Sequence, residues 1–487
     1  MIKRTMREIA DAIGGRLHRT DGSPVVTGSV EFDTRQVGPG DLFVAVPGER
    51  VDGHDFAEAA MRAGAVGVLA TREVPAPAVI VPALDGDTTP RTDGPGKAPS
   101  VLAGLASLAR SVVADLGRSG RMQVVGVTGS CGKTSTKDLI AQVLEPVGTT
   151  VAPPGSFNNE LGHPWTVLRA DEATRHLVLE LAATAPGDIA ALCRTAPPRV
   201  GVVLNVGSAH LGSFRSRDAI AQTKGELVEA LPPAAMGGVA VLNADDPLVA
   251  AMVERTSAKV VRFGTHASAD IRGVDVILDD QARARFRLVS PAGEAPVMLR
   301  LHGAHQVANA LAAAAVGIEL GAGVDQVAAL LSQARRRSAH RMDVNTRADG
   351  VTVINDAYNA NPESVRAALE SLAAIAGARS RRCWAVLGPM TELGETEAEE
   401  HAEIGRLAMA LGINHLLAVG DRTTDMYLAA CREGSDRGDA ILVPDADVAT
   451  AVLDQRLGAD DVVLVKASNT ARLWRVAEAL LPTRSGD

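Results

Sequence analysis

Short apolar runs that end in polar residues alternate with stretches of helical spacing along the middle of the chain. The runs are Gln123–Thr128, Leu177–Glu180, Val200–Asn205 and Val239–Asn243. Alternating strands and helices predict a parallel sheet covered by helices. Ligands of such sheets bind beyond the carboxyl ends of the strands, where Glu180, Asn205 and Asn243 fall.

The two ends of the chain continue this alternation. Before residue 100 the strand-like runs are Asp41–Gly48, Ala65–Ala70 and Ala78–Pro82. A Gly-, Pro-, Asp- and Thr-rich loop over 85–100 then leads to a helical segment over 101–116. Beyond residue 332 the runs are Val351–Asp356, Trp384–Gly388, Leu416–Gly420, Ala440–Pro444 and Val462–Lys466. We therefore predict an α/β protein of three domains: an N-terminal domain (1–100), a central parallel-sheet domain (101–332) and a C-terminal Rossmann-like α/β domain (333–487).

Composition excludes several classes of protein. The 487 residues carry a net charge of −9, with seven Phe, three Trp and two Tyr. Nucleic-acid-binding surfaces need basic patches and exposed aromatic rings, so we expect no nucleic-acid partner. Four cysteines without the spacing of a metal or redox pair favour the reducing cytoplasm. We see neither a signal peptide nor about 18 consecutive apolar residues, and so expect no membrane insertion.

A glycine-rich segment, V-T-G-S-C-G-K-T-S, follows the first central strand and opens a helix. This strand–loop–helix context is typical of a loop that binds the phosphates of ATP. We expect Lys133 to reach the β- and γ-phosphates and the Thr134 hydroxyl to bind Mg²⁺. The residues predicted to surround the nucleotide phosphates are Gly129, Ser130, Cys131, Gly132, Lys133, Thr134 and Ser135. For Cys131 itself we favour a small space-filling side chain without a redox role.

Further long motifs occur in order. They are F-D-T-R-Q-V-G-P-G-D-L-F within Phe32–Phe56, G-S-F-N-N-E-L-G-H-P at Gly155–Pro164, D-A-Y-N-A-N-P-E-S at Asp356–Ser364 and V-L-G-P-M-T-E-L-G at Val386–Gly394. Together with the shortened phosphate loop, they resemble the Mur ligase superfamily, and within it the MurF type, over essentially the whole chain. The resemblance implies ATP- and Mg²⁺-dependent joining of D-alanyl-D-alanine to the C-terminal carboxylate of UDP-N-acetylmuramoyl-tripeptide through an acyl phosphate, in peptidoglycan precursor synthesis.

The resemblance also implies a metal site. Thr134, Glu180, His210 and a carbamylated Lys224 would hold Mg²⁺, because a carbamate replaces the lysine's positive charge with a negative one. Taken singly, Glu180 is also compatible with a solvated carboxylate at a strand end, His210 with a hydrogen-bond donor in a loop, and Lys224 with a surface charge on a helix. Lys133, Lys224, His210 and Arg341 are the catalytic residues that the resemblance implies.

Three more residues are implied on the nucleotide side. Asn309 would lie near the adenine, Arg341 near the γ-phosphate, and Asp356 near the ribose or the metal ligands. The alternatives are a helix-cap Asn, one more surface Arg and a turn-capping Asp. Gln306 stands where the family usually has a first Asn, so its adenine contact departs from the pattern.

Substrate contacts follow from the same resemblance. Thr34 and Arg35 would hold the uridine diphosphate, since a guanidinium fork suits a diphosphate. The residues implied near the acceptor peptide are Asn158 and Asn159, and those near the dipeptide are Tyr358, Asn359 and Asn361. Without the motifs, these residues would be assigned to turns and, for Tyr358, to core packing. The third residue of the acceptor is compatible with diaminopimelate or lysine.

Two segments depart from the family pattern. Pro389 stands where Asp is usual, and Ala467 and Asn469 interrupt the usual K-G-S-R. The alternative functions are a Mur ligase that adds a single amino acid, a folylpolyglutamate synthetase, or a nucleotide-gated binding protein without turnover. We expect a cytoplasmic monomer with a hinge near Gln333–Ser338.

Overall fold

The computed structural model describes residues 1–48, 51–82, 99–118, 120–209, 211–214, 216–434 and 438–481. Contacts divide the chain into two units. Unit 1 comprises Met1–Gly126, Leu144–Ala182 and Asp188–Val200, and unit 2 comprises Val127–Val143, Ala183–Gly187 and Gly201–Asp487. Each unit contains several predicted strands, and the domain boundaries of the sequence analysis stay a prediction.

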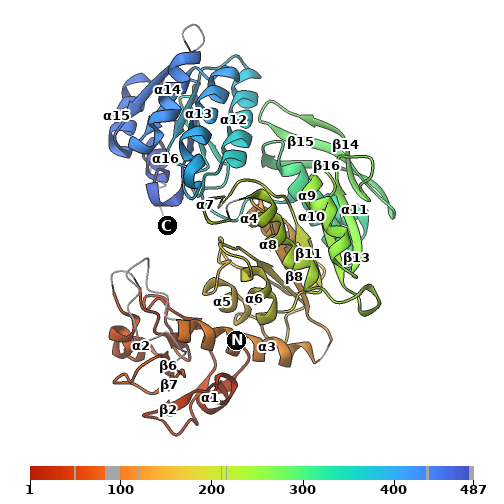
Figure 1. Cartoon of the computed structure of the whole chain (residues 1–487), viewed down its shortest axis with the longest axis vertical. Helices are drawn as coiled ribbons and strands as arrows, with labels where there is room; N and C mark the ends of the chain where they lie inside the picture. The colour runs from red at the N-terminus through yellow and green to blue at the C-terminus, as the bar shows by residue number, and fades with distance from the viewer. Residues whose placement is uncertain are drawn as a thin grey trace. The chain divides into compact units, whose positions relative to one another are not determined.

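The N-terminal part of unit 1 is a small sheet with helices (Figure 1). The strand order is β2-β7-β6-β5-β4, parallel from β4 to β7, with β2 antiparallel. The bounds are β2 Arg16–His18, β4 Val30–Glu31, β5 Leu42–Val44, β6 Gly67–Ala70, β7 Ala78–Ile80, α1 Met6–Ile13 and α2 Ala57–Ala63. The three predicted strands of this part are confirmed, each shortened at its ends. Residues 83–98, most of the predicted loop, lie outside the described residues.

A long apolar helix, α3 (Pro99–Gly117), follows in unit 1. It contacts α1, α5 (Gly162–Val167) and α6 (Asp188–Thr195). Its window over residues 100–117 has a mean hydropathy of 1.3 and is 44% buried, so by length and composition it could cross a membrane. The sequence-based statement that no 18 consecutive apolar residues occur still holds, because Arg110 and Asp115 interrupt α3, and the absence of membrane insertion stays a prediction. A core helix of a soluble protein passes the same test.

The central part of the chain contains more strands than predicted. Within unit 2 the order is β16-β15-β14-β13-β12, followed by β11, whose first residue belongs to unit 1. Within unit 1 the order is β10-β9, and β8 likewise contains a boundary between the units. The bounds are β8 Gln123–Thr128, β9 Thr150–Val151, β10 His176–Glu180, β11 Val200–Val203, β12 Val239–Asn243, β13 Lys259–Gly264, β14 Ile271–Leu278, β15 Arg283–Ser290 and β16 Gly293–His302. The four predicted strands are confirmed as β8, β10, β11 and β12.

Strands β14, β15 and β16 pair antiparallel, which the sequence analysis did not predict. Along β15 and β16 buried and exposed residues alternate, because one face of these strands remains open to solvent. Arginines therefore occupy every second position of β15, and no continuous apolar run marks the strand.

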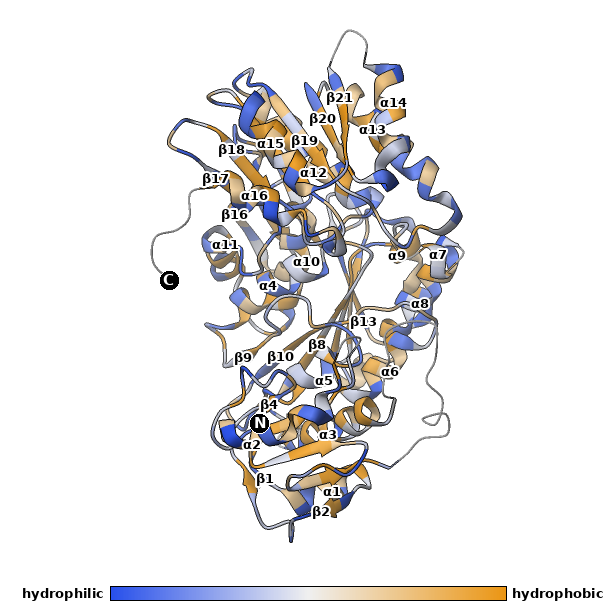
Figure 2. Cartoon of the chain, turned by 90° about the vertical axis from the view of Figure 1, so that its left-hand side faces the viewer, coloured by the Kyte–Doolittle hydropathy of each residue, from blue (hydrophilic) through white to orange (hydrophobic). Residues whose placement is uncertain are grey.

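The C-terminal block has a six-stranded sheet of order β17-β18-β22-β19-β20-β21, parallel except for β17 (Figure 1). The bounds are β17 Asp343–Thr346, β18 Thr352–Asn355, β19 Cys383–Leu387, β20 His415–Val419, β21 Asp439–Val443, β22 Val462–Lys466, α12 Pro362–Gly377, α13 Glu397–Ala410, α14 Thr424–Glu433, α15 Ala446–Arg456 and α16 Trp474–Leu480. All five predicted strands are confirmed, and Figure 2 shows β19, β20 and β21 as mostly hydrophobic.

Helices cover both faces of this sheet. Alternate strand residues such as Ile354 and Leu464 pack with α12, α13 and α14, whereas Val353 and Val463 pack with α15 and α16. Two covered faces explain why the parallel strands β18–β22 are continuous apolar runs, while the antiparallel edge strand β17 is polar. The predicted Rossmann-like α/β class is confirmed for this block.

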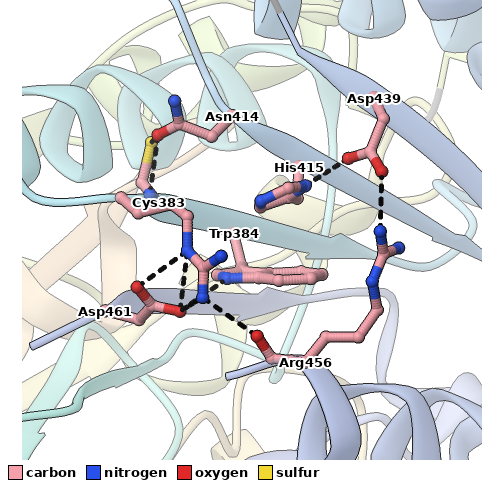
Figure 3. A network of polar contacts seen from close by, with 8 residues as sticks. Cys383, Trp384, Asn414, His415, Asp439, Arg456 and Asp461 are labelled. Atoms are coloured by element: carbon pink, nitrogen blue, oxygen red, sulfur yellow. Dashed lines mark hydrogen bonds and ion pairs between the residues drawn. The ribbon is translucent and has the colours of Figure 1, made fainter. Parts of the chain in front are cut away.

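The amino-terminal ends of these strands are held by a polar network around Trp384 (Figure 3). The His415 ring stacks on the indole with centroids 3.9 Å apart, and the indole N–H donates to Asp461 at 3.0 Å. Asp461 also accepts a forked pair of bonds from Arg382. Because the carboxyl ends of the strands lie at the opposite edge, this network stabilises the sheet and leaves that edge to Asp356 and Lys466.

Candidate functional site

The glycine-rich segment joins β8 to α4 (Lys133–Leu144) as predicted. Gly132 has φ +81°, and a Cβ atom there would lie 2.6 Å from Asn309 Oδ1. A side chain at this position would be strained and would collide, so glycine is required by geometry.

Asn205, directly beyond β11, holds this loop at its backbone. Its Oδ1 accepts from the Cys131 N–H at 2.9 Å, and its Nδ2 donates to the Cys131 carbonyl at 3.1 Å. The Ser130 N–H donates to the Asn205 carbonyl, and Ser130 Oγ accepts from the Gly207 N–H at 2.8 Å. Burial raises the pKa of the Cys131 thiol, in line with a space-filling role. The loop is thus fixed before any ligand arrives.

Arg341 lies at the phosphate loop, although it belongs to the linker before β17. Its Nη2 donates to Thr134 Oγ1 at 3.3 Å, and its guanidinium lies 4.2 Å from the centre of the Tyr358 ring. Lys133 Nζ donates to the Gly129 carbonyl at 2.7 Å. Unit 2 therefore brings Thr134, Arg341 and Tyr358 together beside the loop that carries Lys133, and the predicted phosphate and metal contacts of Lys133, Thr134 and Arg341 stay predictions.

The backbone around Arg341 is unusual. His340 and Met342 have φ values of +55° and +48°, a conformation that non-glycine residues rarely adopt. The Met342 N–H donates to Asp356 Oδ1 at 2.9 Å, and Lys466 Nζ donates to Asp356 Oδ2 at 2.5 Å. Both carboxylate oxygens of Asp356 thus have protein donors that orient the segment carrying Arg341, and its predicted ribose or metal contact stays a prediction.

Lys224 lies in α8 (Arg217–Glu229), a helix whose N-cap is Ser216. It is buried, and burial together with the nearby charge of Lys133 lowers the pKa of its amine to about 7. No carboxylate pairs with it among the described residues. CO₂ reacts with the neutral form of an amine, and the lowered pKa makes that form accessible near neutral pH, so the position fits a carbamate. Because Lys224 is buried, the alternative of a solvated surface charge is wrong.

Asn309 lies inside α10 (Gln306–Glu319), so the alternative of a helix cap is wrong. Its Oδ1 accepts from Thr136 Oγ1 at 3.1 Å, and its Nδ2 donates to Gln306 Oε1 at 2.9 Å. Asn309 therefore ties α10 to the helix that follows the phosphate loop. Its predicted adenine contact stays a prediction.

Glu180 and the two neighbouring asparagines belong to unit 1. Glu180 ends β10, is buried and accepts from Asn158 Nδ2 at 2.7 Å. Asn159 Oδ1 accepts from the Gly162 N–H at 2.9 Å, at the start of α5. These contacts orient the predicted metal ligand and the turn beside it, and the alternative of a solvated Glu180 is wrong.

Thr34 and Arg35 also belong to unit 1. The Arg35 side chain is 85% exposed, and its guanidinium forms a fork with Asp33, with Nη2 to Oδ2 at 2.6 Å. Hydrogen bonds from Arg35 lower the pKa of Asp33. An exposed and already oriented guanidinium is compatible with the predicted diphosphate contact.

The predicted dipeptide segment has well-defined local contacts. Asn361 is the N-cap of α12: its Oδ1 accepts from the Ser364 N–H at 2.9 Å, and Ser364 Oγ accepts from the Asn361 N–H at 3.1 Å. The Asn359 carbonyl accepts from Lys466 Nζ at 2.9 Å. The substrate roles of Tyr358, Asn359 and Asn361 stay predictions.

The two segments that depart from the family pattern, one with Pro389 and the other with Ala467 and Asn469, lie next to each other. The Ser468 N–H donates to the Pro389 carbonyl at 3.1 Å, and Ser468 Oγ accepts from the Thr391 N–H at 3.2 Å. The His401 ring accepts from the Met390 N–H at 3.0 Å. Proline, which lacks an N–H, here contributes its carbonyl, so the loop after β19 remains bonded to the loop after β22.

His210 lies outside the described residues, and its predicted role stays a prediction. Over the described ranges no three His, Cys, Asp or Glu side chains gather into a metal-binding cluster. The sequence analysis did not single out Glu363 or Ser208, which bond to each other. The sequence indicates them only weakly: Glu363 lies in the first turn of the helix that follows the D-A-Y-N-A-N-P-E-S motif, and Ser208 follows a strand.

A phosphate loop between a strand and a helix, approached by an arginine from a Rossmann-like block, defines an α/β nucleotide-binding protein of the phosphate-loop class. Family models match the chain over most of its length: "Mur ligase family, catalytic domain" over residues 27–94, "Mur ligase middle domain" over 127–317 and "Mur ligase, glutamate ligase domain" over 340–469. The chain belongs to the Mur ligase family.

Individual proteins resemble this chain over nearly its whole length. A protein of Mycobacterium tuberculosis named UDP-N-acetylmuramoyl-tripeptide–D-alanyl-D-alanine ligase is 52% identical over 99% of this chain and 98% of its own length. One of the same name from Escherichia coli is 32% identical over 99% of each. MurF of Acinetobacter baumannii superposes with a TM-score of 0.83 at 27% identity over 98% of both chains. MurF of Thermotoga maritima in complex with ADP gives 0.74 at 31% identity, covering 93% of this chain and 97% of that one.

Proposed function

We propose that this protein joins D-alanyl-D-alanine to the C-terminal carboxylate of UDP-N-acetylmuramoyl-tripeptide, with conversion of ATP to ADP and phosphate. The observation that carries the proposal is the meeting of Arg341 and Thr134 at the phosphate loop, with Tyr358 of the D-A-Y-N-A-N-P-E-S motif against the same guanidinium. The loop expected to bind the nucleotide and the motif typical of the MurF type therefore lie at one site. The names of the relatives support this choice of substrates.

In the first step, the acceptor carboxylate attacks the γ-phosphate of ATP, giving an acyl phosphate and ADP. Two anions approach one another, so cationic side chains must offset the charge. Lys133 lies in the loop itself, and Arg341 reaches it from the C-terminal block. Their positions suit the nucleotide phosphates and the transferred phosphoryl group.

In the second step, the free amine of D-alanyl-D-alanine attacks the acyl carbon. The C–O bond to phosphate breaks, inorganic phosphate leaves and the amine proton passes to solvent or phosphate. No covalent enzyme nucleophile is needed, since positioning and electrostatic stabilisation supply the acceleration. Residues Tyr358–Asn361, beside Arg341, are the proposed dipeptide contacts.

Mg²⁺ is the proposed metal, and it would neutralise phosphate charge during transfer. Thr134, Glu180, His210 and Lys224 as a carbamate would hold it. The buried Lys224 amine, with its lowered pKa, and the buried Glu180 carboxylate fit that assignment. We further propose that the enzyme acts as a cytoplasmic monomer.

The test offers purified protein ATP, Mg²⁺, the UDP-linked tripeptide and one amine at a time: D-alanyl-D-alanine, diaminopimelate, lysine or glutamate. ADP release and product mass are measured. We expect amide product with D-alanyl-D-alanine alone, and none when its amine is acetylated. Product with a single amino acid instead would favour the sister ligases, and no product with any amine would favour a binding protein without turnover.

A further inference from the structure

A carboxylate of the C-terminal block reaches the loop that supports the phosphate loop. Glu363 lies in the first turn of α12, and its Oε1 accepts from both the Ser208 N–H at 2.7 Å and Ser208 Oγ at 3.0 Å. Hydrogen bonds to a charged acceptor are among the stronger ones in proteins. Ser208 belongs to the segment that follows β11 in the central part of unit 2.

This segment is bonded to the phosphate loop on its other side. Gly207 donates its N–H to Ser130 Oγ at 2.8 Å, one residue before Ser208. A Cβ atom at Gly207 would lie 2.5 Å from the Glu363 side chain, so glycine is needed for the carboxylate to approach. The chain of contacts therefore runs from Ser130 through Gly207 and Ser208 to Glu363.

The rest of the segment is held independently of α12. The Val206 N–H donates to Asp246 Oδ2 at 2.8 Å, and the Val206 carbonyl accepts from Arg217 Nη2 at 2.7 Å. Loss of the Glu363 contact would thus leave residues 205–206 in place and affect residues 207–208. The second carboxylate oxygen, Oε2, is buried and has no hydrogen-bond partner among the described residues, so Ser208 is the main anchor of this side chain.

We propose that Glu363 is a positioning residue for the ligation reaction: it docks the first turn of α12 onto Ser208 and so sets the segment bearing Tyr358–Asn361 against the phosphate loop. This inference rests on the proposed function. Asn361 is the N-cap of α12, so a shift of the first turn of this helix also moves the proposed dipeptide contacts. The acyl phosphate and the attacking amine then meet only when α12 is docked.

The experiment compares Glu363→Ala, Glu363→Gln, Ser208→Ala and the double variant Glu363→Ala/Ser208→Ala with wild type. Glu370→Ala, on the exposed face of the same helix, is the matched control. Initial rates give kcat and the KM for D-alanyl-D-alanine, and titration with ADP measures the phosphate loop alone. Phosphate released per amide formed is measured in the same assays, and thermal unfolding verifies the fold.

We expect Glu363→Ala to lower kcat/KM for the dipeptide roughly 10- to 100-fold, the scale for losing hydrogen bonds to a charged group. ADP affinity should stay within about twofold, because the loop is held separately by Asn205. Phosphate released per amide should rise, since a misplaced amine leaves the acyl phosphate to water. Glu363→Gln keeps an acceptor for Ser208 and should retain more activity, and the double variant should be no worse than Glu363→Ala.

Wild-type kinetics in Glu363→Ala would overturn the inference. Equal losses in the Gln and Ala variants would show that charge rather than docking matters and would overturn it as well, as would fully additive effects in the double variant. Failure of the proposed function is distinct, because wild-type protein itself would then form no amide with the dipeptide.

Discussion

His163, in α5, is a buried imidazole with neither ring nitrogen hydrogen-bonded among the described residues. Burial lowers its pKa to about 3. The unfolded chain binds a proton at this residue below about pH 6.5, whereas the folded chain does not until about pH 3. Each pH unit lost within that window therefore costs about 1.4 kcal/mol of folding free energy.

The prediction is that His163→Leu flattens this acid dependence. Urea unfolding, followed by the fluorescence of Trp165 on the same helix, should show a smaller loss of stability between pH 6.5 and 4.5 in the variant than in wild type. Parallel profiles for the two proteins would show that His163 is protonated without cost and contradict the prediction.

Lys224 offers a second test at the scale of one side chain. Lys224→Met keeps the length of the side chain and removes an amine that no carboxylate pairs within the described structure. The stability of the fold should not decrease, because burial of an amine without a charged partner is unfavourable. The value of kcat should fall roughly 100-fold or more, the scale for removing an electrostatic stabiliser.

Thermal unfolding and initial rates measure the two effects. Lys259→Met, at an exposed lysine paired with Glu319, is the matched control and should keep wild-type kcat. A Lys224→Met enzyme with wild-type kcat would rule out the proposed metal-holding role.

Site residues could be predicted where a motif fixes them, and less well where tertiary packing decides. The phosphate loop was visible because G-K-T follows a strand, and the structure gives it the expected strand–loop–helix geometry. Arg341 was distinguished from the neighbouring arginines only through the family resemblance, because its approach to Thr134 depends on the linker backbone, which local sequence spacing does not determine. Glu363 was missed for a similar reason: its partner Ser208 is 155 residues away.

At the scale of elements, α12 shows how one residue can serve folding and binding together. Asn361 caps the helix, and Ser364 completes the capping box. Asn361→Ala should lower the free energy of unfolding by about 1 kcal/mol through loss of the cap, whereas Asn361→Ser keeps a capping oxygen. If the side-chain amide also binds the dipeptide, Asn361→Ser should keep wild-type stability and raise the KM for D-alanyl-D-alanine.

Denaturant titration and initial rates separate these two roles. A wild-type KM in Asn361→Ser would restrict Asn361 to capping and refute its substrate role.

Elements buried on both faces were predicted well, and elements with one open face were not. The five parallel strands of the C-terminal sheet, β18–β22, and β8, β10, β11 and β12 are continuous apolar runs, which the sequence shows directly, whereas the polar edge strand β17 was not predicted. Strands β15 and β16 alternate buried and exposed residues, and the last four residues of β14 are exposed, so a search for apolar runs does not detect these three strands. The helix predicted over 101–116 is found as α3 (Pro99–Gly117), whose apolar residues pack against α1, α5 and α6.

At the scale of the whole molecule, the linker between α11 (Val324–Gln333) and β17 is attached to the phosphate-loop helix. Gln142 of α4 donates to the Arg335 carbonyl at 2.9 Å and accepts from the Arg335 N–H at 3.0 Å, and Ser338 Oγ donates to Asp138 Oδ2 at 2.7 Å. The segment Gln333–Ser338, where a hinge is predicted, is therefore hydrogen-bonded to α4.

Gln142→Ala should remove the hydrogen bonds that attach the Arg335 backbone to α4. We expect faster hydrogen exchange of the amides in residues 334–338, because the Arg335 N–H loses its acceptor, while ADP binding is retained. Gln326→Ala, on the exposed face of α11, is the control. Unchanged exchange in the linker would show that Gln142 does not secure it.

The left-handed residues on either side of Arg341 connect all three scales. An L-residue in this conformation costs roughly 1–2 kcal/mol, and glycine adopts it freely. Glycine at 340 or 342 would relieve that backbone cost, but it would also remove the buried Met342 side chain from the core or the His340 ring that stacks on Trp474. The packing of these two side chains therefore holds a strained backbone on both sides of Arg341, and glycine at either position would let the arginine adopt other orientations.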